Sequence, residues 1–318
     1  MIWPKTTIIT DQGEPREAIA PLIISASRST DIPAFHGPWF MRRLEAGYVR
    51  WVNPWNGKSL YVSLSKVQLI VFWTKNPKPF LPCLEKIDRE KINYCIHFTL
   101  NDYEAEGLEE GVPPLAARIE LFRELAGRIG KERVLWRFDP LIITDALPPA
   151  TLLARIRSIG DQINDSTERL TISFLSLYDK VKRNLKNRGI ALRMWDDTER
   201  EIMLAGIGKC LVKWKLHGFS CAEAADYSQF GIVPGKCIDD ALIARLFSHD
   251  SVLMEFIKNA GKTRDNGQRP SCRCIMSKDI GRYNTCGHQC CYCYANTSPH
   301  RASCICRSAL PHGDSIIA

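Results

Sequence analysis

The feature that most constrains the fold is an alternation of short apolar runs with amphipathic stretches. Most runs are rich in β-branched or aromatic residues, and polar or turn residues follow each one, a pattern typical of buried parallel strands. The six runs are residues 21–26, 68–73, 94–98, 133–138, 170–175 and 218–222. We therefore expect an α/β protein with a parallel sheet, and successive strand–helix units favour a barrel or partial barrel over an open sheet.

The intervals between these runs show helical periodicity. Apolar residues recur at helical spacing in residues 115–129 and again in 152–163, so each segment presents one apolar face. Thr198 and Glu201 match a capping box at the start of a further helix, and Gly218 is positioned to end it. Helices of this kind connect and cover parallel strands.

The chain divides into two regions. Residues 1–235 contain the strand–helix alternation, with a predicted inserted hairpin near 49–65 that turns at Asn56 and Gly57. Residues 236–318 contain most of the cysteines. We expect a barrel-like first region followed by a cysteine-rich, cluster-binding region.

Polar side chains gather where the predicted strands end, which is where active sites lie in barrels of parallel strands. One such residue alone is usually a helix cap, but a whole set at one rim predicts a ligand pocket. The arginines and the lysine among them suit an anionic group. The candidate catalytic residues are Arg28, Asp31, Lys75, Arg137, Asp139 and Glu223.

The cysteines indicate a metal centre. The chain has thirteen, and clustered cysteines in a reducing compartment more often bind metal than form disulfides. Cys286, Cys290 and Cys293 have the spacing C-x3-C-x2-C. Three thiolates can hold three irons of a [4Fe–4S] cluster and leave the fourth iron open, whereas a structural zinc site takes four protein ligands.

A second set of cysteines lies outside this motif: Cys221, Cys237, Cys272 and Cys274. Four thiolates could form a closed second [4Fe–4S] cluster or a zinc site, and either would fasten the C-terminal region to the barrel. The alternative is that Cys221 and Cys237 are small buried hydrophobic residues.

Other residues near the motif receive lesser roles. Cys291 lies between two expected ligands and should point away from them. His288 is expected to hydrogen-bond to the cluster rather than to ligate it. Cys304 and Cys306 lie in a terminal segment that we expect to be disordered.

The order Cys286, Cys290, Tyr292, Cys293 resembles the radical SAM superfamily signature, C-x3-C-x-aromatic-C. The resemblance implies a partial (β/α)6 TIM-like barrel, a [4Fe–4S] cluster on the three cysteines, and S-adenosylmethionine (SAM) bound at the open iron. Over nearly its whole length the chain also resembles an uncharacterised, largely bacterial family of unknown function. That likeness rests on residues 27–35 (SRSTDIPAF), 71–77 (VFWTKNP) and 277–298 (SKDIGRYNTC…YCYANTS).

The order of the motifs departs from that superfamily. Its cysteine loop follows the first strand, whereas here residues 27–35 contain no cysteine and the motif follows all six strands. The C-terminal tail would therefore have to fold back over the rim formed by the strand ends. No Gly-Gly-Glu stretch follows the second strand, so no SAM-contacting residue is carried over.

These patterns predict an enzyme that cleaves SAM to a 5′-deoxyadenosyl radical, which abstracts hydrogen from an unknown, anionic small-molecule or nucleotide substrate. A reductant such as flavodoxin or ferredoxin would supply electrons. Two alternatives are an iron–sulfur barrel with hydrolytic chemistry and a zinc-stabilised nucleic-acid-binding module, the latter suggested by the net charge of +8. No apolar run reaches about 18 residues and no secretory signal is recognisable, so we expect a cytoplasmic protein without membrane spans.

Overall fold

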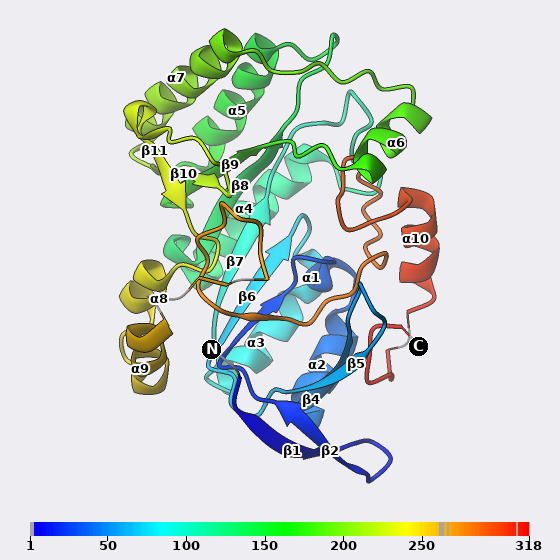
Figure 1. Cartoon of the computed structure of the whole chain (residues 1–318). Coiled ribbons are helices and arrows are strands. Elements are labelled where there is room, and N and C mark those ends of the chain that lie inside the picture. Colours follow the sequence, from blue (N-terminus) through cyan, green and yellow to red (C-terminus); the bar gives the residue numbers. More distant parts are fainter. Residues whose placement is uncertain (1–2, 261–263, 266, 310, 318) are drawn as a thin grey trace.

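The computed structural model describes residues 3–260, 264–265, 267–309 and 311–317 (Figure 1). Its centre is a sheet of eight parallel strands in the order β11-β10-β9-β8-β7-β6-β3-β12. The strands are β3 (Ile23–Ala26), β6 (Leu69–Thr74), β7 (Asn93–Thr99), β8 (Val134–Leu141), β9 (Arg169–Phe174), β10 (His217–Cys221), β11 (Ile232–Gly235) and β12 (Lys278–Asp279). All six predicted runs form strands of this sheet, with ends shifted by a few residues.

The six predicted strands lie side by side in chain order, from β3 to β10. Two further strands extend the sheet, because β11 pairs with β10 and β12 pairs with β3. Between β11 and β12 no strand pairing closes the sheet within the described ranges, so the fold is α/β with a large parallel sheet and not a closed barrel.

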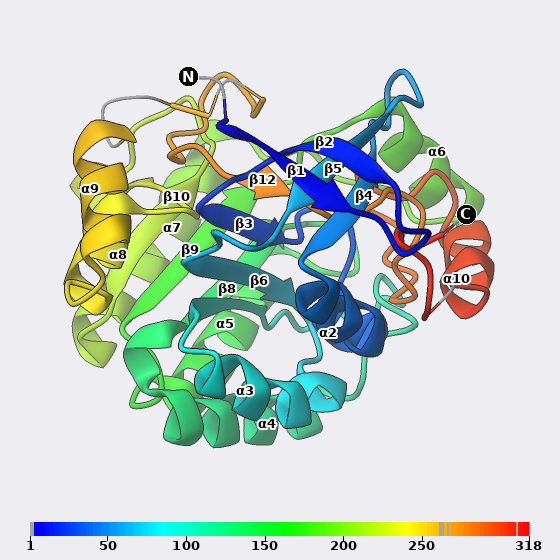
Figure 2. The same ribbon diagram turned by 90° about the horizontal axis from the view of Figure 1, so that it is seen from below.

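Helices cover the outer face of this sheet, as Figure 2 shows for α3, α4 and α5. The apolar faces expected in residues 115–129 and 152–163 are buried, and Phe122 and Ile156 have no exposed surface. The α-helices are α1 (Ile32–Phe35), α2 (Gly37–Ala46), α3 (Leu81–Arg89), α4 (Leu115–Ile129), α5 (Pro149–Ile163), α6 (Asp179–Asn187), α7 (Asp197–Trp214), α8 (Asp240–Leu246), α9 (Ser251–Ala260) and α10 (Pro299–Arg307). Short 3-10 turns are η1 (Lys78–Phe80), η2 (Lys131–Arg133) and η3 (Ser228–Phe230).

The predicted ends of α7 are wrong. The capping box is formed by Asp196, whose carboxylate accepts the Glu199 amide at 2.7 Å, and not by Thr198 and Glu201. The sequence offers both pairs at the same spacing, and the earlier one lets the helix begin sooner. The helix ends at Lys215 in a left-handed conformation. Gly218 lies in β10 instead, where a Cβ would approach the Leu211 side chain to 2.4 Å.

A second, smaller sheet has the strand order β1-β2-β5-β4. The predicted hairpin is confirmed as β4 (Tyr48–Val52) and β5 (Ser59–Ser63), which pair antiparallel. It is joined by an N-terminal hairpin that was not predicted from the sequence, β1 (Lys5–Ile9) and β2 (Pro15–Ile19).

The C-terminal region folds back along the strand ends. Asp279 in β12 accepts the Ser25 hydroxyl at 2.5 Å and the Arg28 amide at 2.7 Å. Farther along, Cys290, Cys291 and Tyr292 pack into the main hydrophobic core. The expectation of disorder around Cys304 and Cys306 is wrong, because Ser298 caps helix α10 there. No helix in the part of the chain that the structure describes is long and apolar enough to cross a membrane.

Candidate functional site

Asp31 fastens the cysteine loop to the strand ends. It follows β3 and caps α1, because its Oδ1 accepts the Ala34 amide at 2.9 Å. Its Oδ2 accepts the Thr74 hydroxyl at 3.0 Å and the Lys75 amide at 2.8 Å, both at the end of β6. The same oxygen meets Nε2 of His288 at 2.7 Å. One buried carboxylate thus joins two strand ends to the tail.

His288 therefore does not take the role expected of it. Its Nδ1 lies 3.2 Å from the carbonyl oxygen of Gly111, so both ring nitrogens are engaged by protein groups and neither is free for a cluster. The ring also packs edge-on against Phe35. His288 positions the loop between Cys286 and Cys290.

The three motif cysteines are free thiols in this anchored loop. Burial raises the pKa of Cys286, Cys290 and Cys293, and for Cys286 and Cys290 the neighbouring motif thiols add to the rise. Cys291 is turned elsewhere, since its Sγ lies 3.6 Å from the carbonyl oxygen of Leu108. From α10, the Cys306 side chain reaches the backbone amide of Gly287.

A buried ion pair lies beside the loop. Lys75 Nζ donates to Glu109 Oε1 at 2.8 Å and to the Tyr292 hydroxyl oxygen at 3.1 Å. Asn101 Nδ2 donates to the same Glu109 oxygen at 3.0 Å, as does the Tyr292 hydroxyl. Burial opposes ionisation of Glu109, but the charges of Lys75 and Arg118 and the hydrogen bonds outweigh it and lower its pKa to about 2. Glu109 Oε2 is buried and has no hydrogen-bond partner among the described residues.

The Lys75 ammonium also acts on the motif thiols. Burial of the lysine opposes its charge, but Glu109 and then Cys290 raise its pKa, so it stays protonated. It lowers the pKa of Cys290 and Cys293 against the larger effect of their burial. A fixed cation next to these thiols favours their thiolate forms, which are the forms that bind metal.

The four cysteines of the second set also lie next to one another in the fold. Cys221 Sγ lies 3.3 Å from Cys237 Sγ. Cys274 Sγ accepts the backbone amide of Cys237 at 3.2 Å, and the Cys272 and Cys274 side chains are within hydrogen-bond reach of each other. That contact lowers the pKa of Cys272, whereas the contact with Cys237 and burial raise that of Cys221. These residues come from β10, the segment after β11, and the segment before β12.

Most of the remaining candidates surround the second set. Arg137 donates to Cys237 Sγ at 3.0 Å and is paired with Asp139, which also accepts the Ser173 hydroxyl. The Arg28 guanidinium lies over the Trp73 ring and 3.8 Å from Asp265. Both arginines are thus engaged by protein groups. Glu223 is half-buried, and its Oε1 accepts the Phe174 amide at 2.9 Å.

Within the described ranges, no group of three or more histidine, cysteine, aspartate or glutamate side chains is placed to hold a metal ion. A single ion needs its ligands to converge on one point, with Zn–S bonds of about 2.3 Å. An iron–sulfur cluster instead distributes its thiolates over several irons.

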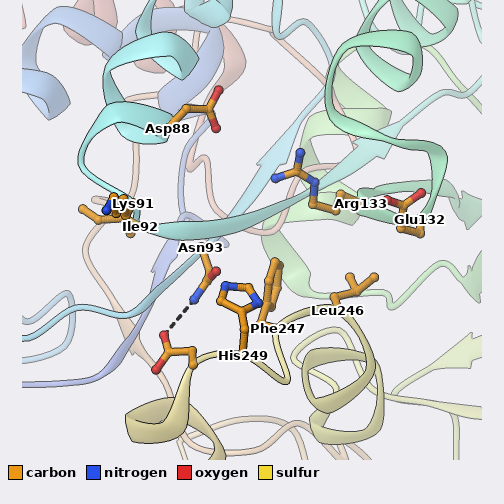
Figure 3. A pocket seen from close by; sticks show the side chains of 10 residues that line it. Asp88, Lys91, Ile92, Asn93, Glu132, Arg133, Leu246, Phe247 and His249 are labelled. Atoms are coloured by element: carbon orange, nitrogen blue, oxygen red, sulfur yellow. Dashed lines mark hydrogen bonds between the residues drawn. The ribbon is translucent and has the colours of Figure 1, made fainter.

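A cavity of about 530 Å³ lies away from both cysteine sets. Figure 3 shows that Asn93, Arg133 and His249 contribute to its wall, and Asn93 is hydrogen-bonded to Asp250 at 2.8 Å. Asn93 begins β7 and Arg133 precedes β8, so this hollow is at the N-terminal edge of the sheet. In parallel barrels that edge serves stability rather than catalysis, so we assign it no function.

Glu109 and Asn101 are site residues that were not predicted from the sequence. Asn101 lies just after β7, so the rule that selected the other rim residues could have included it. Glu109 lies in an irregular segment between β7 and α4 with no motif around it. Its backbone forms an isolated bridge with Cys290, a contact that only the folded chain reveals.

A family model described as "Domain of unknown function (DUF1848)" matches residues 23–295. That range contains the motif cysteines and the second set. No curated protein matches the chain. Among solved structures, one described as a "putative alpha-L-fucosidase" from Bacteroides thetaiotaomicron is 16% identical, with 68% of this chain and 76% of that chain covered and a TM-score of 0.26. So low a TM-score supports no argument about fold or activity.

Proposed function

The chain belongs to this family of unknown function, as its motifs predicted, and we propose that it is a radical SAM-type iron–sulfur enzyme. The observation that carries the proposal is the loop of Cys286, Cys290 and Cys293, free of disulfides and held by Asp31 at the C-terminal ends of β3 and β6. These thiols would hold a [4Fe–4S] cluster. With one iron left open, such a cluster supplies the electron that cleaves SAM to methionine and a 5′-deoxyadenosyl radical.

We also propose that the six central strands form a partial (β/α)6 barrel. The strands β3, β6, β7, β8, β9 and β10 follow one another in chain order with helices on the outside, as in a partial (β/α)6 barrel. In this arrangement the motif comes to the strand ends from the C-terminal part of the chain, which explains why it follows all six strands in the sequence.

Two features of the site fit the group. The first is the buried Lys75 ammonium, which Glu109 and the Tyr292 hydroxyl hold beside the loop and whose charge would offset that of a thiolate-bound cluster. The second is Glu109 Oε2, a buried carboxylate oxygen without a partner, next to the loop. An unpaired buried oxygen of this kind is costly unless a ligand satisfies it, so it is available to the ammonium group of the SAM amino acid portion.

The protein's own residues would position and isolate the reaction. Asp31 and His288 fix the loop, and Tyr292 and Asn101 hold Glu109 in place. The packing of Cys290 and Tyr292 into the core excludes water from that side of the site. The substrate stays unassigned, because Arg28 and Arg137 already have protein partners.

The test is anaerobic reconstitution with iron and sulfide, followed by addition of dithionite in place of flavodoxin or ferredoxin, and of SAM. We expect 5′-deoxyadenosine from the wild type and none from Cys290→Ala. Cys291→Ala is the matched control, because its thiol contacts Leu108, and it should retain the activity. Cys306→Ala should also retain the activity, because we expect the fourth iron to have no protein ligand. If Cys306 from α10 were that ligand, the cluster would be closed to SAM.

Two outcomes would contradict the proposal. Wild-type protein that binds iron but forms no more 5′-deoxyadenosine than Cys290→Ala would favour an iron–sulfur protein without SAM chemistry. A gain of SAM cleavage in Cys306→Ala would show that Cys306 normally occupies the fourth iron.

A further inference from the structure

The two open edges of the parallel sheet meet at the second cysteine set. Cys237 follows β11, the strand at one edge, and Cys274 precedes β12, the strand at the other. The Ile275 amide donates to the Ile238 carbonyl oxygen at 3.2 Å, and the Cys237 amide donates to Cys274 Sγ. Cysteine side chains thus lie where strand pairing ends.

The thiols themselves are arranged in a row. Cys221 contacts Cys237, Cys237 is next to Cys274, and Cys274 is next to Cys272. All four are free thiols. Four neighbouring thiols are the ligand set of a closed [4Fe–4S] cluster or of zinc, and analysis of iron, sulfide and zinc tells the two apart.

Two arginine guanidinium groups lie beside these thiols, and each is also paired with a carboxylate. Arg137 donates to Cys237 Sγ at 3.0 Å and is 4% exposed, and the Arg28 guanidinium is close to Cys274 and Cys237. Arg28 NH2 is buried and has no hydrogen-bond partner among the described residues. Four thiolates with a cluster carry net negative charge, and sulfur atoms accept hydrogen bonds, so this unpaired donor fits an anionic sulfur cluster.

We infer that Cys221, Cys237, Cys272 and Cys274 bind a second, closed [4Fe–4S] cluster that links the two edges of the sheet. Binding releases four protons, one from each thiol, and leaves the sulfur oxidation state unchanged. All four irons then have protein ligands, so the cluster has no site for SAM. It joins Cys221 of β10 to the start of the tail, where the sheet has no strand pairing.

The experiment separates this cluster from the one on the motif. A triple variant, Cys286→Ala with Cys290→Ala and Cys293→Ala, is purified anaerobically as the full chain. We expect about four irons and about four sulfides per chain. On reduction, its electron paramagnetic resonance signal should not change when SAM is added. The result does not depend on whether the motif binds a cluster or cleaves SAM.

Adding Cys237→Ser to the triple variant should remove the iron, whereas adding Cys83→Ser, a thiol on α3 outside both sets, should not. If Cys237→Ser is poorly folded by circular dichroism, Cys272→Ser is the second test, because that side chain lies at the end of the row. Retention of all the iron in a folded Cys237→Ser or Cys272→Ser protein would overturn the inference. About one zinc and no iron in the triple variant, or no metal at all, would overturn it as well.

Discussion

Removing the Lys75 charge should destabilise the protein by about 3 kcal/mol, because it leaves Glu109 ionised and buried without its main counter-ion. The side chain of Glu109 is 3% exposed and that of Lys75 is 14% exposed, and they lie 2.8 Å apart. At an effective dielectric constant of about 20, that distance gives about 6 kcal/mol of attraction, part of which offsets the cost of desolvation. The fall in the Glu109 pKa from 4.5 to about 2 corresponds to about 3 kcal/mol.

The assay is urea unfolding of metal-free protein under anaerobic, reducing conditions, so that no bound ligand adds to the apparent stability. Lys75→Met, Glu109→Gln and the double variant complete a double-mutant cycle. We expect each single variant to lose about 3 kcal/mol and the double variant to lose less than their sum. A loss below about 1 kcal/mol for Lys75→Met, or additive effects within about 0.5 kcal/mol, would refute the reasoning.

The pH dependence gives a second check. The pKa of Glu109 is lower in the folded than in the unfolded protein, so its stabilising contribution is present above pH 4.5 and is lost as the pH falls towards 2. In Lys75→Met the pKa of Glu109 is lowered less, because the lysine charge is gone. Protonation of Glu109 at low pH then removes the unpaired buried charge from this variant. The stability difference between wild type and Lys75→Met should therefore shrink below pH 4.5. A constant difference would contradict the assignment.

Two further variants test the frame of the site. Asp31→Ala should destabilise the protein by at least about 2 kcal/mol and speed amide hydrogen exchange in residues 285–293, because three segments lose their common acceptor. The control Asp196→Ala removes only a helix cap, so it should cost about 1 kcal/mol and leave exchange in that loop unchanged. Unchanged exchange in Asp31→Ala would show that other contacts hold the loop. Gly160→Ala should destabilise the protein by about 1–2 kcal/mol, because a Cβ there would approach the Trp214 ring to 2.3 Å. The control Gly127→Ala on α4 has nothing within 4 Å of its Cβ, so it should not destabilise the protein. Equal unfolding midpoints for the two variants would refute the packing argument.

Local patterns in the sequence were sufficient for the six central strands, for the helices α4, α5 and α7, and for the family. A short, continuous apolar run rich in β-branched residues reflects a strand that is buried on both faces. The six strands from β3 to β10 could therefore be recognised without knowing their neighbours. The motif of Cys286, Cys290 and Cys293 is likewise a property of one short segment. The second cysteine set was suggested by the cysteines left outside that motif, of which only Cys221 was placed at the end of a predicted strand.

Tertiary structure decided what depends on distant pairs. Asp31 and His288 are 257 residues apart in the chain, and Glu109 finds Lys75 from a segment without a recognisable pattern. The β1–β2 hairpin was likewise missed, because its burial depends on the smaller sheet. Such contacts form because a buried charge or hydrogen-bonding group must find a partner, and that requirement fixes neither the partner nor its place in the sequence. The sequence by itself therefore determined the sheet and the two sets of thiols, and only the fold determined which charges and which strand edges meet them.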